Sequence, residues 1–100
     1  MSNWPFDFEQ PAGLALLDKD AEFPVGVSGM AIHSIDGDTK AIWDKNNPDE
    51  VAAARATFDA LKKKKYLAYS VDKDGNKGKL ITEFDPNAER VIMSPPMAGG

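Results

Sequence analysis

Few side chains in this chain of 100 residues have the types and spacing that catalysis requires. It has no cysteine and a single histidine, His33, which excludes thiolate catalysis, cysteine–zinc sites and multi-histidine metal sites. Asp36 and Asp38 could act as an acid and a base, but their Asp-Gly-Asp context is typical of a turn. The sequence places no nucleophile beside His33, so we interpret it as a structural or surface residue. We therefore expect neither an enzyme nor a bound cofactor.

A calcium loop is the next candidate. Asp72, Asp74, Asn76 and Glu83 fall at positions one, three, five and twelve of an EF-hand loop. However, Lys77 stands at position six, where the loop needs glycine, and the preceding segment YLAYSV is typical of a strand. We interpret residues 72–78 as a long hairpin turn and expect no metal there, with calcium binding as the alternative.

The remaining candidate is the carboxylate at the end of the sequence, Pro95-Pro96-Met97-Ala98-Gly99-Gly100. The two prolines favour an extended polyproline geometry, and six residues can project an end by roughly 20 Å. Gly99 and Gly100 have no side chains, so they can enter a narrow cleft and leave the Gly100 carboxylate unhindered. The alternative is an end that frays without function, as many termini do.

The composition is that of one small globular domain. Hydrophobic residues make up 42% and charged residues 28% of the chain, and the formal net charge is −4. An acidic surface disfavours nucleic acid and anionic membranes as partners. No apolar run approaches the ~20 residues that span a bilayer, and the first residues do not resemble a secretory signal. Together with the absence of cysteine, this predicts a cytoplasmic protein.

Residues 1–28 differ from the rest and are expected to form an irregular arm. Pro5, Pro11 and Pro24 interrupt any long helix or strand, yet the arm is too apolar for a solvated tail. Its large apolar residues are Trp4, Phe6, Phe8, Leu14, Leu16, Leu17 and Phe23. We favour an arm that packs across its own domain, with docking on a partner as the alternative.

The elements that follow are predicted from periodicity and capping. Residues 29–44 indicate a β-hairpin that turns at Asp36-Gly37-Asp38, and residues 47–64 a helix capped by Asn47 with Pro48 at its first position. An apolar stripe of Val51, Ala54, Phe58 and Leu61 marks its buried face. Strands are predicted at 66–71, 79–84 and 90–94. One helix across a sheet built from two hairpins and a last strand is an α+β fold.

This order (ββαββ, then a final β) resembles the β-grasp fold of ubiquitin-like proteins, with a domain over residues 29–94 and a tail over 95–100. The resemblance implies that the first and last of these strands lie side by side and parallel in the middle of the sheet. The segment RVIMSPPMAGG at 90–100 also resembles the ending of molybdopterin-synthase small subunits and thiamine-pathway sulfur carriers. Those proteins end in an apolar strand, Pro-Pro, an aliphatic residue, a small residue and Gly-Gly. Met97 stands where valine is commoner.

The resemblance implies a carrier or modifier whose reactive group is the terminal carboxylate. In such families an adenylating enzyme attaches AMP to that carboxylate using ATP. A sulfur donor then gives a thiocarboxylate, or a thiol takes the acyl group on its way to an isopeptide bond with an acceptor protein. The expected activation site is Gly99 and Gly100, presented by the tail residues Pro95, Pro96, Met97 and Ala98. The alternative function is a non-catalytic structural or interaction module, such as a phage or assembly component that docks through its arm.

Overall fold

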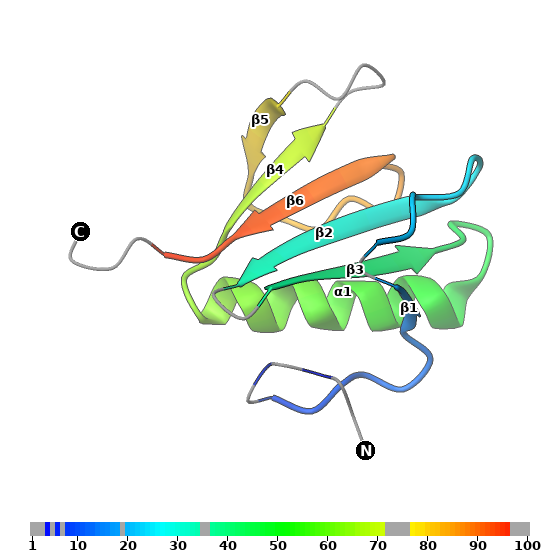
Figure 1. Cartoon of the computed structure of the whole chain (residues 1–100), viewed down its shortest axis with the longest axis horizontal. Coiled ribbons are helices and arrows are strands. Elements are labelled where there is room, and N and C mark those ends of the chain that lie inside the picture. The colour runs from blue at the N-terminus through cyan, green and yellow to red at the C-terminus, as the bar shows by residue number, and fades with distance from the viewer. Residues whose placement is uncertain are drawn as a thin grey trace.

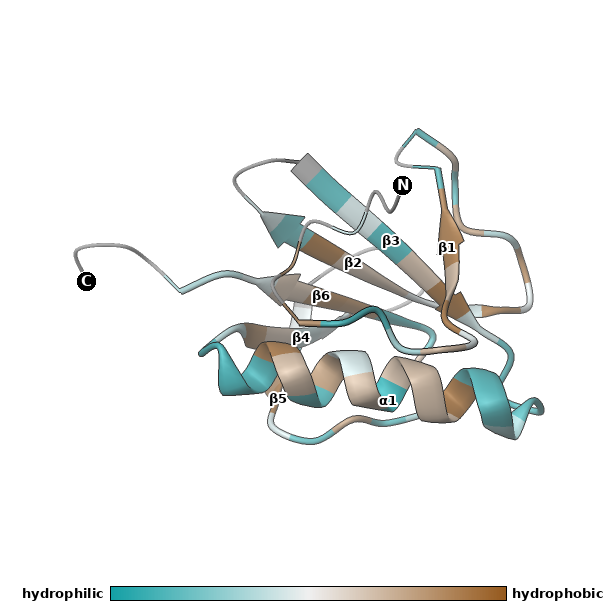
Figure 2. Cartoon of the chain, turned by 90° about the horizontal axis from the view of Figure 1, so that it is seen from below, coloured by the Kyte–Doolittle hydropathy of each residue, from teal (hydrophilic) through white to brown (hydrophobic). Residues whose placement is uncertain are grey.

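The chain folds as one helix packed against a mixed six-stranded sheet, as seen in a computed structural model. The structure describes residues 4, 6, 8–18, 20–34, 37–71 and 77–96. The elements are β1 (Ala15–Leu17), β2 (Ser28–Ser34), β3 (Gly37–Trp43), α1 (Pro48–Lys63), β4 (Leu67–Val71), β5 (Lys77–Ile81) and β6 (Arg90–Ser94). Their order across the sheet is β1-β3-β2-β6-β4-β5, and α1 lies across one face (Figures 1 and 2). The α+β prediction is confirmed.

The predicted hairpin at 29–44 is formed by β2 and β3. Its strands are antiparallel, and Ser34 pairs with Gly37, so only residues 35–36 separate the strands. These two residues lie outside the part of the chain that the structure describes. The prediction put Gly37 and Asp38 in the turn, whereas both belong to β3 because the ladder continues to the hairpin's end.

The predicted helix is confirmed together with its cap. The Asn47 side chain accepts hydrogen bonds from the backbone N–H groups of Asp49 and Glu50, at 3.1 and 3.3 Å. Glu50 does not close a standard capping box, because its carboxylate accepts from the Asp44 backbone N–H at 2.9 Å and from the Asn47 side-chain amide at 3.0 Å. The cap therefore ties the end of β3 to the start of α1.

The core lies between α1 and the facing side of the sheet. Residues of β2, β3, β4 and β6 alternate, so that every second side chain points towards the helix. The fully buried side chains from the strands are Met30, Ile32, Ala41, Trp43, Ala68, Val91 and Met93. From α1, Ala54, Phe58 and Leu61 of the predicted stripe are fully buried, and Val51 packs at the edge.

The second half of the sheet follows the prediction except at one strand. β6 has the predicted bounds, and β4 begins one residue later than predicted. β5 spans Lys77–Ile81 instead of 79–84. Phe84 leaves the sheet to pack against Trp43 and Phe58, with ring centroids 5.1 and 5.7 Å apart, which ends the strand before it. Here the packing of the Phe84 ring against the core is more favourable than further pairing of β5 with β4.

The prediction of an irregular arm over residues 1–28 is wrong at two places. Ala15–Leu17 form β1, which pairs antiparallel with residues 40–42 of β3, and Ser28 already belongs to β2. The pairing partner of β1 lies more than twenty residues away in the sequence, so no local signal marks this three-residue strand. Leu14, just before it, is buried in the core.

The remaining described part of the arm packs against the chain's own domain. Trp4, Phe6 and Phe8 form an aromatic cluster in which the Trp4 indole N–H donates to the Phe8 carbonyl at 2.8 Å. Phe6 contacts the Tyr66 ring at a centroid distance of 6.5 Å, and all three cluster residues pack against the core. The packing agrees with an arm that folds across its own domain.

Candidate functional site

The tail begins at the centre of the sheet. β6 pairs in parallel with β2 from Gly29↔Arg90 to Ile32↔Met93, and antiparallel with β4 from Leu67↔Ser94 to Val71↔Arg90. Val91 and Met93 are also buried against α1. Backbone hydrogen bonds on both sides and burial on one face hold this strand, so the residue from which the tail starts has a fixed position.

Pro95 and Pro96 carry the chain out of the sheet. Both are exposed, and neither has an N–H group with which to continue the ladder. They leave at the end of the molecule where β6 and α1 have their C-terminal ends (Figure 1). Met97, Ala98, Gly99 and Gly100 lie outside the described residues, so the chemistry expected of them remains a prediction.

Two different kinds of side chain flank the base of the tail. Leu67, the partner of Ser94 on β4, is 42% exposed. On the other side, the register of β2 and β6, continued by one residue beyond Ile32↔Met93, puts His33 level with Ser94. His33 Nδ1 lies 3.0 Å from Oδ1 of Asp38, its cross-strand partner on β3. The tail therefore starts between an apolar and a polar surface.

The sequence alone does not connect His33 with Asp38. It indicates a histidine without a nucleophile beside it, and it indicates turn residues at Asp36 and Asp38, of which Asp36 lies outside the described residues. In a hairpin with two residues between its strands, however, positions five apart around the turn lie opposite each other. His33 and Asp38 have this spacing, so the pair could have been found from the sequence.

Among the described residues, a segment after β1 covers one half of the sheet face that is turned away from α1. Phe23, from the segment after β1, lies against Gly29 of β2, where an added Cβ atom would be 2.4 Å from its ring. The Arg90 guanidinium and the Lys40 ammonium lie over that ring, 4.7 and 5.6 Å from its centroid. Lys40 Nζ also donates to the Ala21 carbonyl at 2.7 Å. These contacts hold the segment across β3, β2 and the start of β6.

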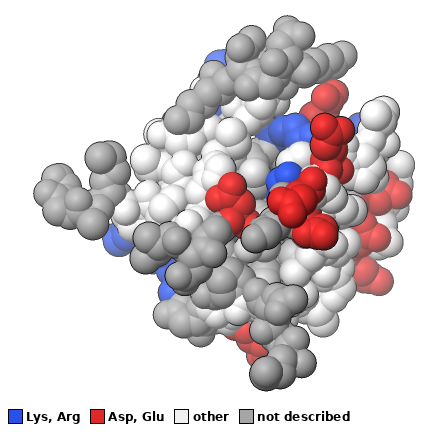
Figure 3. Space-filling view, viewed as in Figure 1, with Lys and Arg blue, Asp and Glu red and all other residues white. Residues whose placement is uncertain are grey.

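The other half of that face carries apolar side chains beside the tail. Tyr69 of β4 pairs with Ile92 of β6 and with Leu80 of β5. Leu80 is 55% exposed, and Leu67 lies two residues before Tyr69 on the same face of β4. We call Leu67, Tyr69, Leu80 and Ile92 the outer apolar face. Figure 3 shows acidic side chains gathered on the right of this view and mostly uncharged surface nearer the C-terminal end of β6.

The structure offers no metal or calcium site among its described residues. No group of three or more histidine, aspartate and glutamate residues in that part of the chain could hold a metal ion. In the calcium-like segment, Asp72, Asp74 and Asn76 lie outside the described residues, and Glu83 is exposed.

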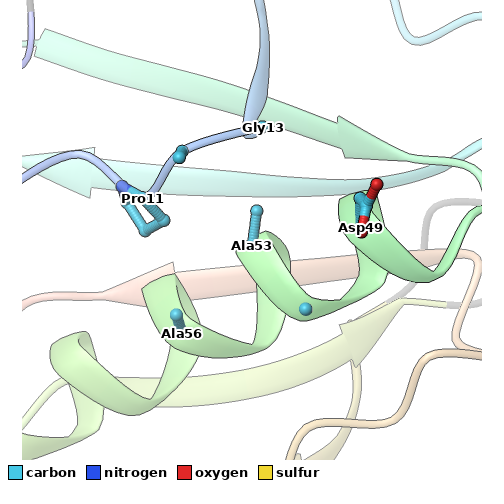
Figure 4. A pocket seen from close by; sticks show the side chains of 7 residues that line it. Pro11, Gly13, Asp49, Ala53 and Ala56 are labelled. Carbon is cyan, nitrogen blue, oxygen red and sulfur yellow. The ribbon is translucent and has the colours of Figure 1, made fainter.

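The surface also has an open groove between the arm and α1. Its volume is about 480 Å³, and it lies between Pro11–Gly13 of the arm and the stretch of α1 from Asp49 to Ala56 (Figure 4). The helix lines it with Ala52, Ala53 and Ala56, so its walls are small and apolar and Asp49 is the one charged residue among them. This groove lacks the convergent polar groups of a catalytic pocket.

Two further observations bear on the class of protein. Among the described residues, no helix has the length and apolar character needed to cross a membrane. Comparisons with protein-family models, curated proteins and solved structures found no match to this chain.

Proposed function

We propose that the chain is a β-grasp protein that acts as a ubiquitin-like carrier or modifier, with its Gly100 carboxylate activated by an adenylating partner. The observation that carries this proposal is the position of β6, which is a central strand, runs parallel to β2 and continues directly into Pro95 and Pro96. A strand of this kind leading into Pro-Pro and Gly-Gly is what the resemblance of residues 90–100 implies.

The order of the strands supports the β-grasp assignment. Without β1, the sheet reads β3-β2-β6-β4-β5, with α1 between the first hairpin and the later strands. In chain order, β2 is the first and β6 the last of these five strands. They lie side by side and parallel, as the resemblance implies. β1 adds to the open edge of β3 and leaves the order of the other five unchanged.

The proposed chemistry needs no side chain of this protein. A carboxylate oxygen of Gly100 attacks the α-phosphorus of ATP in the partner's active site, the bond from that phosphorus to the bridging oxygen breaks, and pyrophosphate leaves. The product is an acyl-adenylate. A sulfur nucleophile then attacks its carbonyl carbon and displaces AMP, which leaves a thiocarboxylate or a thioester. A sulfur carrier and a protein modifier share the first step and differ in this nucleophile.

The surroundings of the tail support a protein as the activating partner. The tail can extend by roughly 20 Å from Ser94, so an enzyme that binds its end also covers the surface at its base. Leu67 and Leu80 expose apolar area there, and an exposed apolar surface beside a reactive group is typical of a protein interface. Trp4, Phe6 and Phe8 of the arm pack against the chain's own core, which makes them unavailable as the docking element of the assembly-module alternative.

Deleting Gly99 and Gly100 tests the proposal. We expect ATP–pyrophosphate exchange by the source organism's adenylating enzyme to be lost, because the reacting carboxylate no longer reaches the active site. The unfolding temperature should not change, because the deleted residues follow the last strand of the sheet. A chain lacking its first two residues is the matched control and should retain exchange. Undiminished exchange by the C-terminal deletion would refute the proposal.

A further inference from the structure

The polar pair at the tail's base, His33 and Asp38, has no role in the fold's core. Their side chains are 43% and 51% exposed, and they lie on the sheet face opposite α1, because Ile32 beside His33 points into the core. An exposed pair of this kind contributes little to stability. His33 lies on β2, the strand next to Ser94 of β6, and Asp38 lies one strand further away on β3.

The chemistry of the pair defines what it can bind. A carboxylate only accepts hydrogen bonds, so in the contact with Asp38 the Nδ1 atom of His33 carries the proton. In the neutral imidazole, Nε2 is then an acceptor. Asp38 also has a second carboxylate oxygen, so the pair presents a further hydrogen-bond acceptor at the base of the tail.

The neighbouring cation on this face is engaged elsewhere. Lys40 lies two residues from Asp38 on the same face of β3, where it could neutralise the carboxylate. Instead, its ammonium group donates to the Ala21 carbonyl at 2.7 Å and lies over the Phe23 ring. Among the described residues, Lys40 therefore does not neutralise the Asp38 carboxylate, which contacts His33.

We propose that His33 and Asp38 form a recognition site for an arginine or lysine side chain of the adenylating partner. This inference rests on the proposed function, since it takes the partner to be the enzyme that binds the tail. The outer apolar face contacts the same partner on the Leu67 side of the tail, and the His33–Asp38 pair contacts it on the other side. The pair determines which adenylating enzyme accepts this chain, because an enzyme without a cation there would take the Asp38 carboxylate out of water without compensating its charge.

A charge reversal tests this inference by steady-state ATP–pyrophosphate exchange with the full chain as the varied substrate. We expect Asp38→Lys to raise the KM for the chain at least about tenfold, because it sets two cations against each other, and to leave kcat unchanged. Asp38→Asn, which keeps the size and removes the charge, should raise KM by a smaller factor. Asp59→Lys is the matched control, since Asp59 is an exposed residue on α1, which packs against the opposite face of the sheet from His33 and Asp38.

The outcomes separate the two proposals. An increase in KM for Asp38→Lys that Asp59→Lys does not share supports the recognition site. If the wild-type chain is adenylated and the two lysine variants have equal KM values, the recognition site is refuted while the proposed function stands. If no adenylating enzyme of the source organism accepts the wild-type chain, the proposed function fails and the recognition site fails with it. Thermal unfolding of each variant verifies that the fold is kept.

Discussion

Lys65, which follows the C-cap residue Lys64 of α1, adopts a backbone conformation that favours glycine. Its φ angle is +73°, the left-handed region that costs a residue with a Cβ atom about 1 kcal/mol or more. The conformation closes the helix end: the N–H of Tyr66 donates to the Leu61 carbonyl at 3.1 Å, and that of Lys65 to the Lys62 carbonyl at 3.0 Å. The strain at one residue therefore satisfies two helix carbonyls.

Replacing Lys65 with glycine tests whether its left-handed conformation costs stability. We expect Lys65→Gly to raise the free energy of unfolding by about 1 kcal/mol, because glycine adopts the left-handed region without a steric penalty. Urea denaturation measures the change. Lys63→Gly, in the last turn of α1, is the control and should lower the free energy of unfolding by up to about 1 kcal/mol. A loss of stability in Lys65→Gly would contradict the account.

Tyr66, the next residue, makes stability depend on pH. Burial raises the pKa of its hydroxyl above the ordinary value of 10.0, and the positive charge of Lys64 opposes this in part. The folded chain thus releases the phenolic proton less readily than the unfolded chain. The resulting contribution is fully present below pH 10.0 and is lost as the pH rises through the folded-state pKa.

The pH dependence can be isolated by substitution. The free energy of unfolding should fall between about pH 8 and about pH 11 in the wild-type chain, and it should fall less in Tyr66→Phe, which has no proton to release there. Urea denaturation at the two pH values gives both differences. Equal losses in the two proteins would exclude Tyr66 as the cause.

At the scale of elements, local signals predicted most of the fold. Asn47 and Pro48 mark the start of α1, and Pro95 the end of β6, because capping and the missing proline N–H act within a few residues. β1 and the bounds of β5 could not be predicted in this way. β1 exists because β3 offers an open edge, and β5 ends because Phe84 reaches the core, and both causes are tertiary.

The attachment of the N-terminal arm to the domain depends on Leu14, which lies just before β1 and is 8% exposed. We expect Leu14→Ala to lower the free energy of unfolding by about 3 kcal/mol, because it leaves a cavity between the arm and the core. It should also speed cleavage by chymotrypsin at Phe8, since the arm would detach more often. Leu16→Ala is the control, because Leu16 is 39% exposed, and it should cost much less. Similar effects of both variants would mean that the arm is not anchored through Leu14.

For the whole molecule, the activation site at Gly99 and Gly100 stays a prediction from the sequence, whereas the surroundings of the tail follow from the fold. Gly99 and Gly100 stand out by composition and position alone. The neighbours of the tail come from β2, β3 and β4, and only the order of the strands brings Leu67 and His33 to the two sides of Ser94. The cover over Gly29 on the sheet face opposite α1 likewise follows from the path of the segment that carries Phe23.

The state of the Gly100 carboxylate in the protein isolated from its own cells is the most direct test of the proposed function. Mass spectrometry of the C-terminal peptide should find either oxygen replaced by sulfur at Gly100, as in a sulfur carrier, or an isopeptide bond from Gly100 to a lysine of another protein, as in a modifier. If every copy instead ends in an ordinary carboxylate, also after enrichment for thiocarboxylates and for conjugates, the account is contradicted.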